Sequence, residues 1–311
     1  MVAFYYNKFF YIIIFITTLL LLFTLFFDSK YDPDLPIFYT AKSPNEFSIQ
    51  NINISLADKL FEFSKNKCET ISRTDFINSI DKNLNSLEIG PFHSPCLLDK
   101  NVKYFDVFSK KELIEKAKIL NIDSSRVPVI DYVSPSADLK IINEKFDVVF
   151  SSHNIEHQVD LIQHLNDVYE LLNKNGRYYL FIPTKYYIFD HYIPETLLSD
   201  VLSAHSFPNN RHTLKTMLTQ CETTHNEVKL HWENDHGTNL YSYKRLPCYK
   251  DRVNAYFKKN EYVDAHQWRL HPENFVFILN SLYMMGLVKF RIDKLYCTMV
   301  NSHEFEVVLI K

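Results

Sequence analysis

Glycine is scarce in this chain, with four glycines among 311 residues, although proteins use it at about 7% of positions. The turn G-x-G-x-x-G, through which a backbone approaches the pyrophosphate of a dinucleotide, is absent from the sequence. This absence disfavours a nicotinamide-dinucleotide enzyme. Three of the glycines, at positions 90, 176 and 286, fall at boundaries between expected elements, so they mark places where the chain turns.

The sequence also has no cluster of basic residues and no closely spaced cysteines. Lys and Arg are dispersed and the formal net charge is -3, so we expect no nucleic-acid partner. The five cysteines stand at positions 68, 96, 221, 248 and 297 without any C-x-x-C spacing, which disfavours a zinc site built from thiolates. Core-forming residues are plentiful, because 46% of the chain is hydrophobic and 15% aromatic, and this predicts a globular fold.

One long apolar run is present near the N-terminus. The run from Phe9 to Phe27 has no charged residue and lies between Lys8 and Asp28, and a helix of this length spans the roughly 30 Å of a bilayer core. A cleaved signal peptide, the alternative, has a shorter apolar region of about 7–15 residues. The sequence therefore predicts a transmembrane anchor over residues 1–28 and a single-pass membrane protein. Lysines on both sides of the run leave its orientation open.

Residues 29–84 are predicted to be a polar, proline-bearing stem with two short helices near residues 55–64 and 74–80. These helices either pack on the main domain or space it from the membrane. From Leu87 onward, short apolar strands alternate with amphipathic helices, the pattern of a parallel sheet with helices on its faces. Residues 85–311 are therefore predicted to form the main domain.

Several boundaries of this domain are expected from local signals. Ser109 and Glu112 form a capping box that opens a helix ending near residue 121, and Asn175-Gly176 is expected to end a helix over residues 161–172. A last helix, between Pro272 and Gly286, precedes a closing hairpin. The first strand is expected to end at residue 88, the next four to cover residues 102–106, 127–133, 146–151 and 177–182, and the hairpin strands to lie near residues 288–300 and 304–310.

Two acidic residues stand at the ends of the first two strands. The segment Leu87-Glu-Ile-Gly90 contains an acid and then a glycine, and the next apolar run ends at Asp106. A glycine at a strand end brings bare backbone against a bound nucleotide, and an acid at the end of the next strand accepts the ribose hydroxyls. The pair predicts a nucleoside site.

These residues resemble the class I S-adenosylmethionine-dependent methyltransferases, and within them the group whose first motif reads like Leu-Glu-Ile-Gly-Pro91 with a later proline, here Pro95. The stretches 146–157, 171–176 and 181–183 are similar to that family's fourth strand, following helix and fifth strand, in order and spacing. The resemblance implies a Rossmann-like α/β fold, a seven-stranded methyltransferase sheet whose last strand is antiparallel. It also implies S-adenosylmethionine as the cofactor.

The same resemblance implies where the cofactor lies. Glu88 and Gly90 would line its methionine end, Asp106 would accept from the ribose hydroxyls, and residues 136–138 would lie near the adenine. His153, just past the fourth strand, would face the sulfonium and the substrate. The expected cofactor-binding residues are Glu88, Gly90, Pro91, Asp106, Ser136, Ala137 and Ser152.

Three residues after the fourth strand are the predicted catalytic residues: His153, Glu156 and His157. Methyl transfer needs alignment of donor and acceptor and, for a hydroxyl acceptor, a base that removes a proton, for which a histidine suffices. The trio could instead hold a divalent metal through two nitrogens and an oxygen, but such spacing is common by chance, and no metal is predicted. A further alternative is an ordinary helix start capped by Glu156.

About 100 residues separate the fifth strand from the end of the last helix, far more than typical connections contain. Long insertions at the carboxyl edge of a sheet form substrate caps, and the expected cap covers about residues 184–271. Its many aromatic and imidazole groups suit a sugar ring or a small polar acceptor. In the resembling group, patterns similar to Phe189-Asp-His191 and two others recur. The substrate-side candidates are Asp190, His191, Arg211, His212, Asp264 and His266.

The sequence therefore predicts a membrane-anchored S-adenosylmethionine-dependent methyltransferase, a transferase acting on an oxygen or nitrogen of a glycan or small polar acceptor. A glycan is preferred because of the anchor and the aromatic cap. Two alternatives stay open. Because the first motif keeps one glycine, the chain could be a catalytically weak, methyltransferase-like interaction module. Because of the anchor, it could instead be a quinone or lipid methyltransferase.

Overall fold

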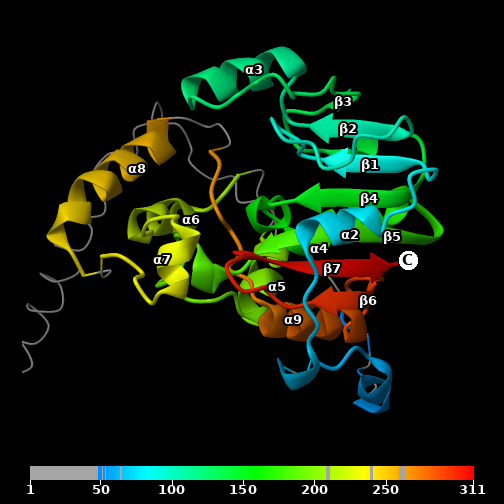
Figure 1. Cartoon of the computed structure of the whole chain (residues 1–311). Coiled ribbons are helices and arrows are strands. Elements are labelled where there is room, and N and C mark those ends of the chain that lie inside the picture. Colours follow the sequence, from blue (N-terminus) through cyan, green and yellow to red (C-terminus); the bar gives the residue numbers. More distant parts are fainter. Residues whose placement is uncertain are drawn as a thin grey trace, which may run out of the picture. The chain divides into compact units, whose positions relative to one another are not determined.

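A computed structural model describes residues 48–50, 52, 54–63, 65–207, 211–238, 241–258 and 263–311, all within one compact unit, residues 43–311. A seven-stranded sheet in the order β3-β2-β1-β4-β5-β7-β6 lies at its centre (Figure 1). The strands are β1 (Ser86–Ile89), β2 (Val102–Asp106), β3 (Tyr132–Val133), β4 (Phe146–Ser152), β5 (Leu172–Pro183), β6 (Arg291–Tyr296) and β7 (Glu304–Ile310). Strands β1 to β5 pair in parallel, and β7 is antiparallel to both of its neighbours. The predicted seven-stranded sheet with an antiparallel last strand is confirmed.

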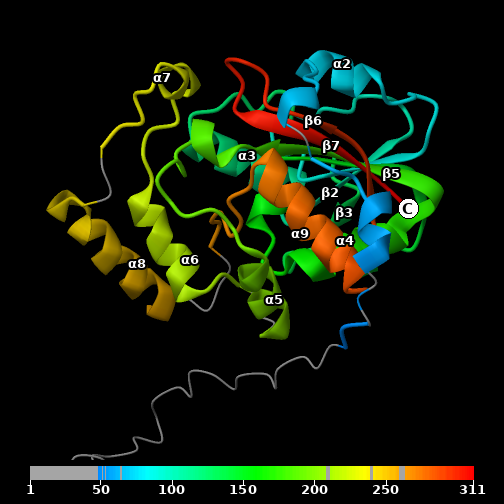
Figure 2. The same cartoon turned by 90° about the horizontal axis from the view of Figure 1, so that it is seen from below.

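Helices cover both faces of this sheet (Figure 2). On one face, Phe76 of α2 packs against Phe150 and Phe181 in a buried apolar cluster. On the other face, α4 and α9 bury apolar side chains such as Leu165 and Phe275 in the larger core. The described helices are α2 (Arg73–Asn78), α3 (Lys110–Ile119), α4 (Leu161–Leu171), α5 (Leu198–Ser206), α6 (Leu214–Thr219), α7 (Val228–Trp232), α8 (Leu246–Lys258) and α9 (Pro272–Met284).

The central strand β4 has apolar residues on both of its faces because both faces of the sheet are covered. In β4, Val148 and Phe150 point to the α2 side while Val149 points to the α4 side, and all three are buried. A strand of this kind reads as a continuous apolar run, which is why β4 was recognisable in the sequence. The capping box at Ser109 and Glu112 is also confirmed, since each residue bonds the other's backbone N–H.

Two predicted boundaries differ from the structure. The third strand is shorter than expected, because Pro128 has no backbone N–H for a strand ladder and pairing with β2 begins only at Tyr132. The turn expected at Asn175-Gly176 does not end the helix. Instead, α4 ends at Leu171 and the chain enters β5 at once, where the buried Leu172 pairs with Phe146 of β4.

The prediction of a membrane anchor is corrected. Within the described ranges, no helix combines the length and the apolar character that a bilayer crossing needs. The apolar run from Phe9 to Phe27 lies outside the described residues. We therefore withdraw the transmembrane helix, the single-pass membrane location and the membrane partner. The helix expected near residues 74–80 is α2, and a 3-10 helix, Ile54–Lys59, stands where the other stem helix was expected.

Residues 184–271, hereafter the cap, contain helices α5 to α8. The cap lies beyond the carboxyl ends of β1, β2 and β4, towards which the arrowheads of these strands point (Figure 1). Two disulfides are present: Cys221–Cys248 lies inside the cap, and Cys68–Cys297 joins the segment before α2 to the segment after β6. Their sequence separations of 27 and 229 residues follow no short motif. Cys96 remains a free thiol.

Candidate active site

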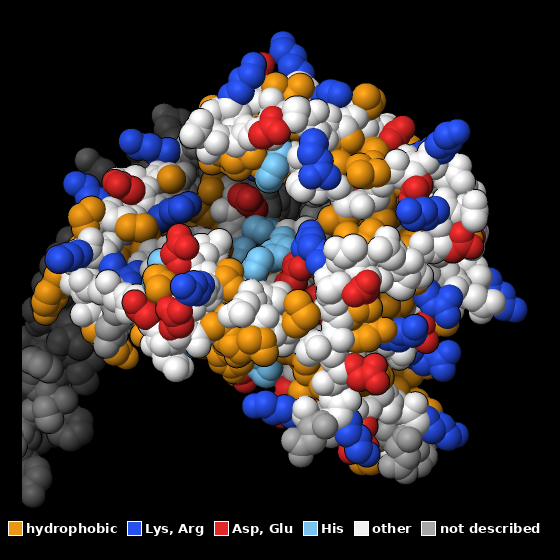
Figure 3. Space-filling model, viewed as in Figure 1, with side chains coloured by type: hydrophobic (Ala, Val, Ile, Leu, Met, Phe, Trp, Pro, Cys, Tyr) orange, Lys and Arg blue, Asp and Glu red, His pale blue; other side chains and the backbone are white. Residues whose placement is uncertain are grey.

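The candidate site lies at the carboxyl edge of the parallel strands. In the space-filling view, this region of the molecule is a hollow in which histidine and acidic side chains gather (Figure 3). Three non-glycine residues with left-handed backbone follow strands there: Phe92 (φ 41°) after β1, Ala137 (φ 55°) after β3 and His153 (φ 48°) after β4. Such conformations cost energy and cluster at functional sites. Their placement marks this edge as the functional one.

Gly90 is required by its surroundings. Its φ is +71°, and a Cβ added to it would lie 2.8 Å from the side-chain nitrogen Nδ2 of Asn154, so any larger residue would be strained and would clash. Its N–H donates to the carbonyl of Phe105 at the end of the neighbouring strand. Gly90 itself is half-buried, so its backbone still reaches the surface of the edge.

Asp106 ends β2 beside this glycine. Its side chain is 7% exposed and its Oδ1 accepts the backbone N–H of Phe108 at 3.0 Å. Burial raises the pKa of Asp106, while the backbone amides of Phe108, Val107 and Phe92 oppose the rise. The bare backbone at Gly90 and a carboxylate at Asp106 therefore lie at adjacent strand ends, which is the arrangement a nucleoside requires.

Glu88 holds the loop that follows β1. Its carboxylate is 2% exposed and accepts the backbone N–H groups of Cys96 at 2.8 Å and Leu97 at 2.9 Å. Burial raises its pKa to about 7, against the lowering effect of these two bonds. Pro91 lies in the loop so held. Glu88 therefore shapes this part of the edge through the backbone of residues 91–97.

The remaining predicted cofactor residues lie at two other strand ends. Ser136 and Ala137 are exposed in the loop after β3, where the Oγ of Ser136 lies 3.3 Å from that of Ser134. Ser152, the last residue of β4, accepts a hydrogen bond from Nη2 of Arg73 at 2.9 Å. These loops surround the strand ends that carry Gly90 and Asp106.

His153 is held by a carboxylate that the sequence did not identify as part of the site. Its ring nitrogen Nε2 lies 2.8 Å from Oε2 of Glu304, the first residue of β7. Arg73 of α2 binds the same carboxylate through two bonds of 2.7 and 2.6 Å. Burial would raise the pKa of Glu304, but His153 and Arg73 outweigh it and lower that pKa to about 2. Glu304 is therefore a stable anion beside His153.

Glu156 and His157 lie in the 3-10 helix Ile155–His157 next to His153. Glu156 is 1% exposed, and its Oε1 lies 3.5 Å from Nε2 of His157. The other ring nitrogen of His157, Nδ1, lies 2.9 Å from Oδ1 of Asp264. Burial opposes protonation of His157, but Asp264 and Glu156 outweigh it and raise its pKa to about 10. The neighbouring imidazoles likewise lower the pKa of Glu156 in spite of its burial.

The cap adds a second histidine to this group. Nδ1 of His266 lies 2.5 Å from Oδ2 of Asp190, which is fully buried, and its ring meets that of His157 edge to face at 4.7 Å. The backbone N–H groups of Gln267 and Trp268 both donate to the carbonyl of Glu156. Three predicted substrate-side residues, Asp190, Asp264 and His266, are therefore gathered around the predicted catalytic pair.

The other three substrate-side candidates have different surroundings. Nδ1 of His212 lies 3.2 Å from the side chain of Gln267, and burial lowers the pKa of His212 to about 4. The guanidinium of Arg211 lies over the ring of Tyr256 in α8. His191 stacks on the ring of His236 at 3.6 Å, within a separate cluster of cap histidines.

Comparisons with known proteins give one family match and several similar structures. Residues 93–180 match the family model described as a methyltransferase domain, whereas no curated protein matches the chain. An S-adenosylmethionine-dependent methyltransferase structure from Clostridium acetobutylicum is 11% identical and covers 77% of this chain and 92% of its own, with a TM-score of 0.39. A second S-adenosylmethionine-dependent methyltransferase structure, from Mesorhizobium loti, is 13% identical to this chain. The match covers 76% of this chain and 96% of the other, with a TM-score of 0.38.

A third structure is longer than this chain. The chain spans 55% of the length of a Nostoc punctiforme protein provisionally named an O-methyltransferase, with 13% identity, 77% of this chain covered and a TM-score of 0.34. The family match and the order of the sheet define residues 93–180 as part of a class I S-adenosylmethionine-dependent methyltransferase domain. The chain therefore contains a methyltransferase domain, and the cofactor of such a domain is S-adenosylmethionine.

Proposed function

We propose that this methyltransferase acts on a hydroxyl oxygen of a small polar acceptor, with a glycan as the favoured class, and that His153 is its base. The observation that carries the proposal is the pair formed by His153 and Glu304 at the carboxyl edge of the sheet, 2.8 Å apart. The preference for a sugar rests on the aromatic and imidazole side chains of the cap. A nitrogen acceptor is the alternative within the same mechanism.

The Glu304 carboxylate sets the tautomer of His153. Because a carboxylate only accepts hydrogen bonds, Nε2 of His153 carries the hydrogen that Glu304 receives, and Nδ1 keeps its lone pair. The His153 side chain is 31% exposed, so Nδ1 can receive a proton from an acceptor hydroxyl. Glu304 then stabilises the imidazolium that forms, as a carboxylate does in other histidine-carboxylate pairs.

The other residues position the reactants. Gly90 and Asp106 hold the nucleoside, with Pro91, Ser136, Ala137 and Ser152 in the loops around it. When bound, S-adenosylmethionine supplies the methyl group: the acceptor oxygen bonds to the methyl carbon while the electron pair of the breaking carbon–sulfur bond stays on sulfur. The cap closes the acceptor side of the site, where Asp264 is 57% exposed and Asp190 holds His266.

The experiment that tests this function is metabolite and glycan profiling with isotopically labelled methionine in cells that express the chain. Wild type is compared with His153→Ala and with Asp106→Ala, and His225→Gln in the cap serves as the control. We expect a labelled methyl ether in wild type and the control that is lost in both variants. If no product carries label in wild type, or the label is equal in all four strains, the proposed activity is wrong and an interaction module is favoured.

A further inference from the structure

Glu156 is a buried charge without a hydrogen-bond partner. Its side chain is 1% exposed, and neither carboxylate oxygen has a hydrogen bond among the described residues. An unpaired buried carboxylate is costly, so such groups pair with a cation or coordinate a metal. The nearest ring nitrogen, Nε2 of His157, lies 3.5 Å from Oε1, at the outer limit of a hydrogen bond.

Two histidines beside Glu156 are each oriented by an aspartate. Nδ1 of His157 lies 2.9 Å from Asp264, and Nδ1 of His266 lies 2.5 Å from Asp190. The His266–Asp190 contact is a hydrogen bond, whereas the His157–Asp264 contact is an ion pair without hydrogen-bond geometry. In both histidines, Nε2 is the nitrogen left to bind a further partner. Histidines that ligate metals in proteins are oriented in this manner, with the second ring nitrogen donating to a carboxylate.

The three potential ligands also converge. One ligand atom from each of Glu156, His157 and His266 lies within 4.8 Å of the others, so one ion between them is reachable at metal–ligand bonds of about 2.0–2.2 Å after a small movement. The two imidazole rings are nearly perpendicular, at 85°. Because ring lone pairs lie in the ring plane, crossed planes allow both nitrogens to point at one ion.

We propose that Glu156, His157 and His266 bind a divalent transition-metal ion, and that this ion takes the acceptor's hydroxyl oxygen as a further ligand. Two imidazoles and one carboxylate form a ligand set that leaves positions open for a substrate oxygen. On binding, the ion displaces the proton that His157 holds beside Glu156 and takes over the balance of that buried charge, and it favours loss of the hydroxyl proton. The binding of the acceptor to the ion rests on the proposed function. It narrows the acceptor to molecules that are methylated on oxygen.

Two other groups of ligand-type residues among the described residues are less suited to an ion. In the group His153, His303 and Glu304, the carboxylate is already bound by the guanidinium of Arg73, and this fixed positive charge repels a metal. In the group His191, His231 and His236, the rings of His191 and His236 are stacked with 10° between their planes, so their lone pairs do not converge. This second group offers a control for the experiment.

The test is titration of the full chain, freed of metal with a chelator, with Co²⁺ followed by calorimetry and visible absorption. No cofactor or acceptor is present, so failure of the proposed function does not affect the result. We expect the full chain to bind one equivalent of Co²⁺ and to show d–d absorption bands typical of nitrogen and oxygen ligands. Zn²⁺ should displace the bound Co²⁺. Glu156→Gln and His266→Gln should each weaken binding by at least about 100-fold, and Asp190→Asn by about 10–100-fold.

His231→Gln is the matched control, a histidine in the stacked cluster, and should bind Co²⁺ as wild type does. Circular dichroism establishes that each variant is folded. If a variant does not fold, the thermal unfolding of the wild type still tests the site, because one equivalent of bound Co²⁺ should raise the unfolding midpoint of the wild type. No binding by wild type, unchanged binding in folded Glu156→Gln and His266→Gln, or loss of the equivalent in His231→Gln would each overturn the proposed site.

Discussion

At the scale of single residues, His153 and Glu304 have distinct roles in the proposed transfer. Replacing His153 by Ala removes the base, and general-base catalysis contributes typically 10²–10⁴-fold. We therefore expect kcat to fall by about that factor with the labelled acceptor found by profiling, while the cofactor Kd stays near that of wild type. The measurement is transfer of the labelled methyl group at saturating cofactor. Equal rates for His153→Ala and His225→Gln would exclude His153 as the base.

Glu304→Gln separates positioning from catalysis. The amide keeps the size of the carboxylate but donates and accepts, so it no longer fixes Nε2–H of His153. We expect a fall in kcat smaller than that of His153→Ala and a shift of the pH profile of kcat, because the imidazolium loses its anion. A fall in protein stability with an unchanged profile would show that Glu304 serves only the fold.

How much of the site the sequence could predict depends on where its residues stand in the chain. His153, Glu156 and His157 follow one strand and could be named together, and Asp264 and His266 stand in one short pattern of the cap. Glu304 lies 151 residues from His153 and reaches it only because β7 pairs with β5. Arg73 stands in the expected stem, where nothing in the sequence pointed to a contact with β7.

At the scale of elements, β7 contains a second buried acid, Glu306, which is 2% exposed. Burial and the neighbouring Glu304 raise the pKa of Glu306 to about 9 from 4.5. The folded protein therefore holds a proton on Glu306 that the unfolded chain releases above pH 4.5. The stability linked to this proton is fully present below pH 4.5 and is lost as the pH rises towards 9.

Glu306→Gln removes this linkage, because Gln does not titrate. We expect the variant to be more stable than wild type by ~2 kcal/mol at pH 8 and to differ little at pH 4.5. Urea unfolding at the two pH values gives the difference directly. A stability difference that does not change with pH would contradict the assigned protonation of Glu306.

Element boundaries were predictable where local chemistry decides them. The capping box of α3 and the bracket of Pro272 and Gly286 around α9 are local signals, and both helices lie where they predict. The start of β5 was not predictable, because Leu172 becomes a strand residue through its partner Phe146 in β4. Local turn residues, Asn175 and Gly176, then lie inside the strand.

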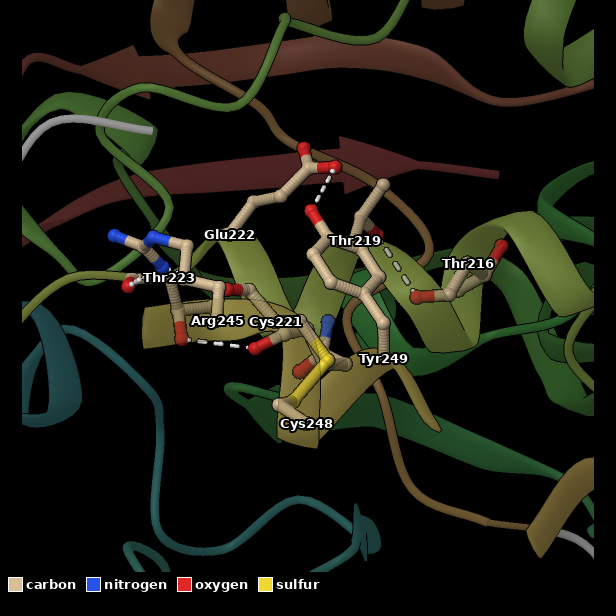
Figure 4. The surroundings of a disulfide bond; sticks show 9 residues. Thr216, Thr219, Cys221, Glu222, Thr223, Arg245, Cys248 and Tyr249 are labelled. Carbon is tan, nitrogen blue, oxygen red and sulfur yellow. Dashed lines mark hydrogen bonds between the residues drawn. A yellow bond between two sulfur atoms is a disulfide. The ribbon is translucent and has the colours of Figure 1, made fainter. Parts of the chain in front are cut away.

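At the scale of the whole molecule, a disulfide clamps the cap. Cys221–Cys248 joins the 3-10 helix Gln220–Glu222 to α8, and Arg245 adds bonds to the carbonyls of Cys221 and Thr223 (Figure 4). A cross-link over 27 residues stabilises a fold by ~3.5 kcal/mol in the chain-entropy model. We expect Cys221→Ser with Cys248→Ser to lower the free energy of unfolding by about that amount.

Cys96→Ser, which removes the free thiol, is the matched control for the disulfide prediction. Urea unfolding of the three proteins under oxidising conditions gives the comparison, and a reducing agent should bring wild type towards the double variant. If the double variant unfolds at the same urea concentration as Cys96→Ser, the bond does not support the cap.

The overall architecture was predictable because the sheet order follows from the alternation of buried strands and amphipathic helices together with the family resemblance. The division of the chain at residues 28 and 84 and the substrate role of the cap remain predictions. The membrane anchor was wrong as a description of the fold, since no described helix has the required length and apolarity. The disulfides were missed because the paired cysteines are distant in sequence.

The central claim is that the edge between β1 and β2 holds the adenosyl group. Calorimetric titration of the full chain with S-adenosylhomocysteine tests it most directly. We expect one site in wild type and at least about 100-fold weaker binding in Asp106→Ala, because two ribose bonds to a carboxylate are lost at about 1.5–3 kcal/mol each. Absence of heat at millimolar ligand in wild type, or equal affinity in Asp106→Ala, would contradict the claim.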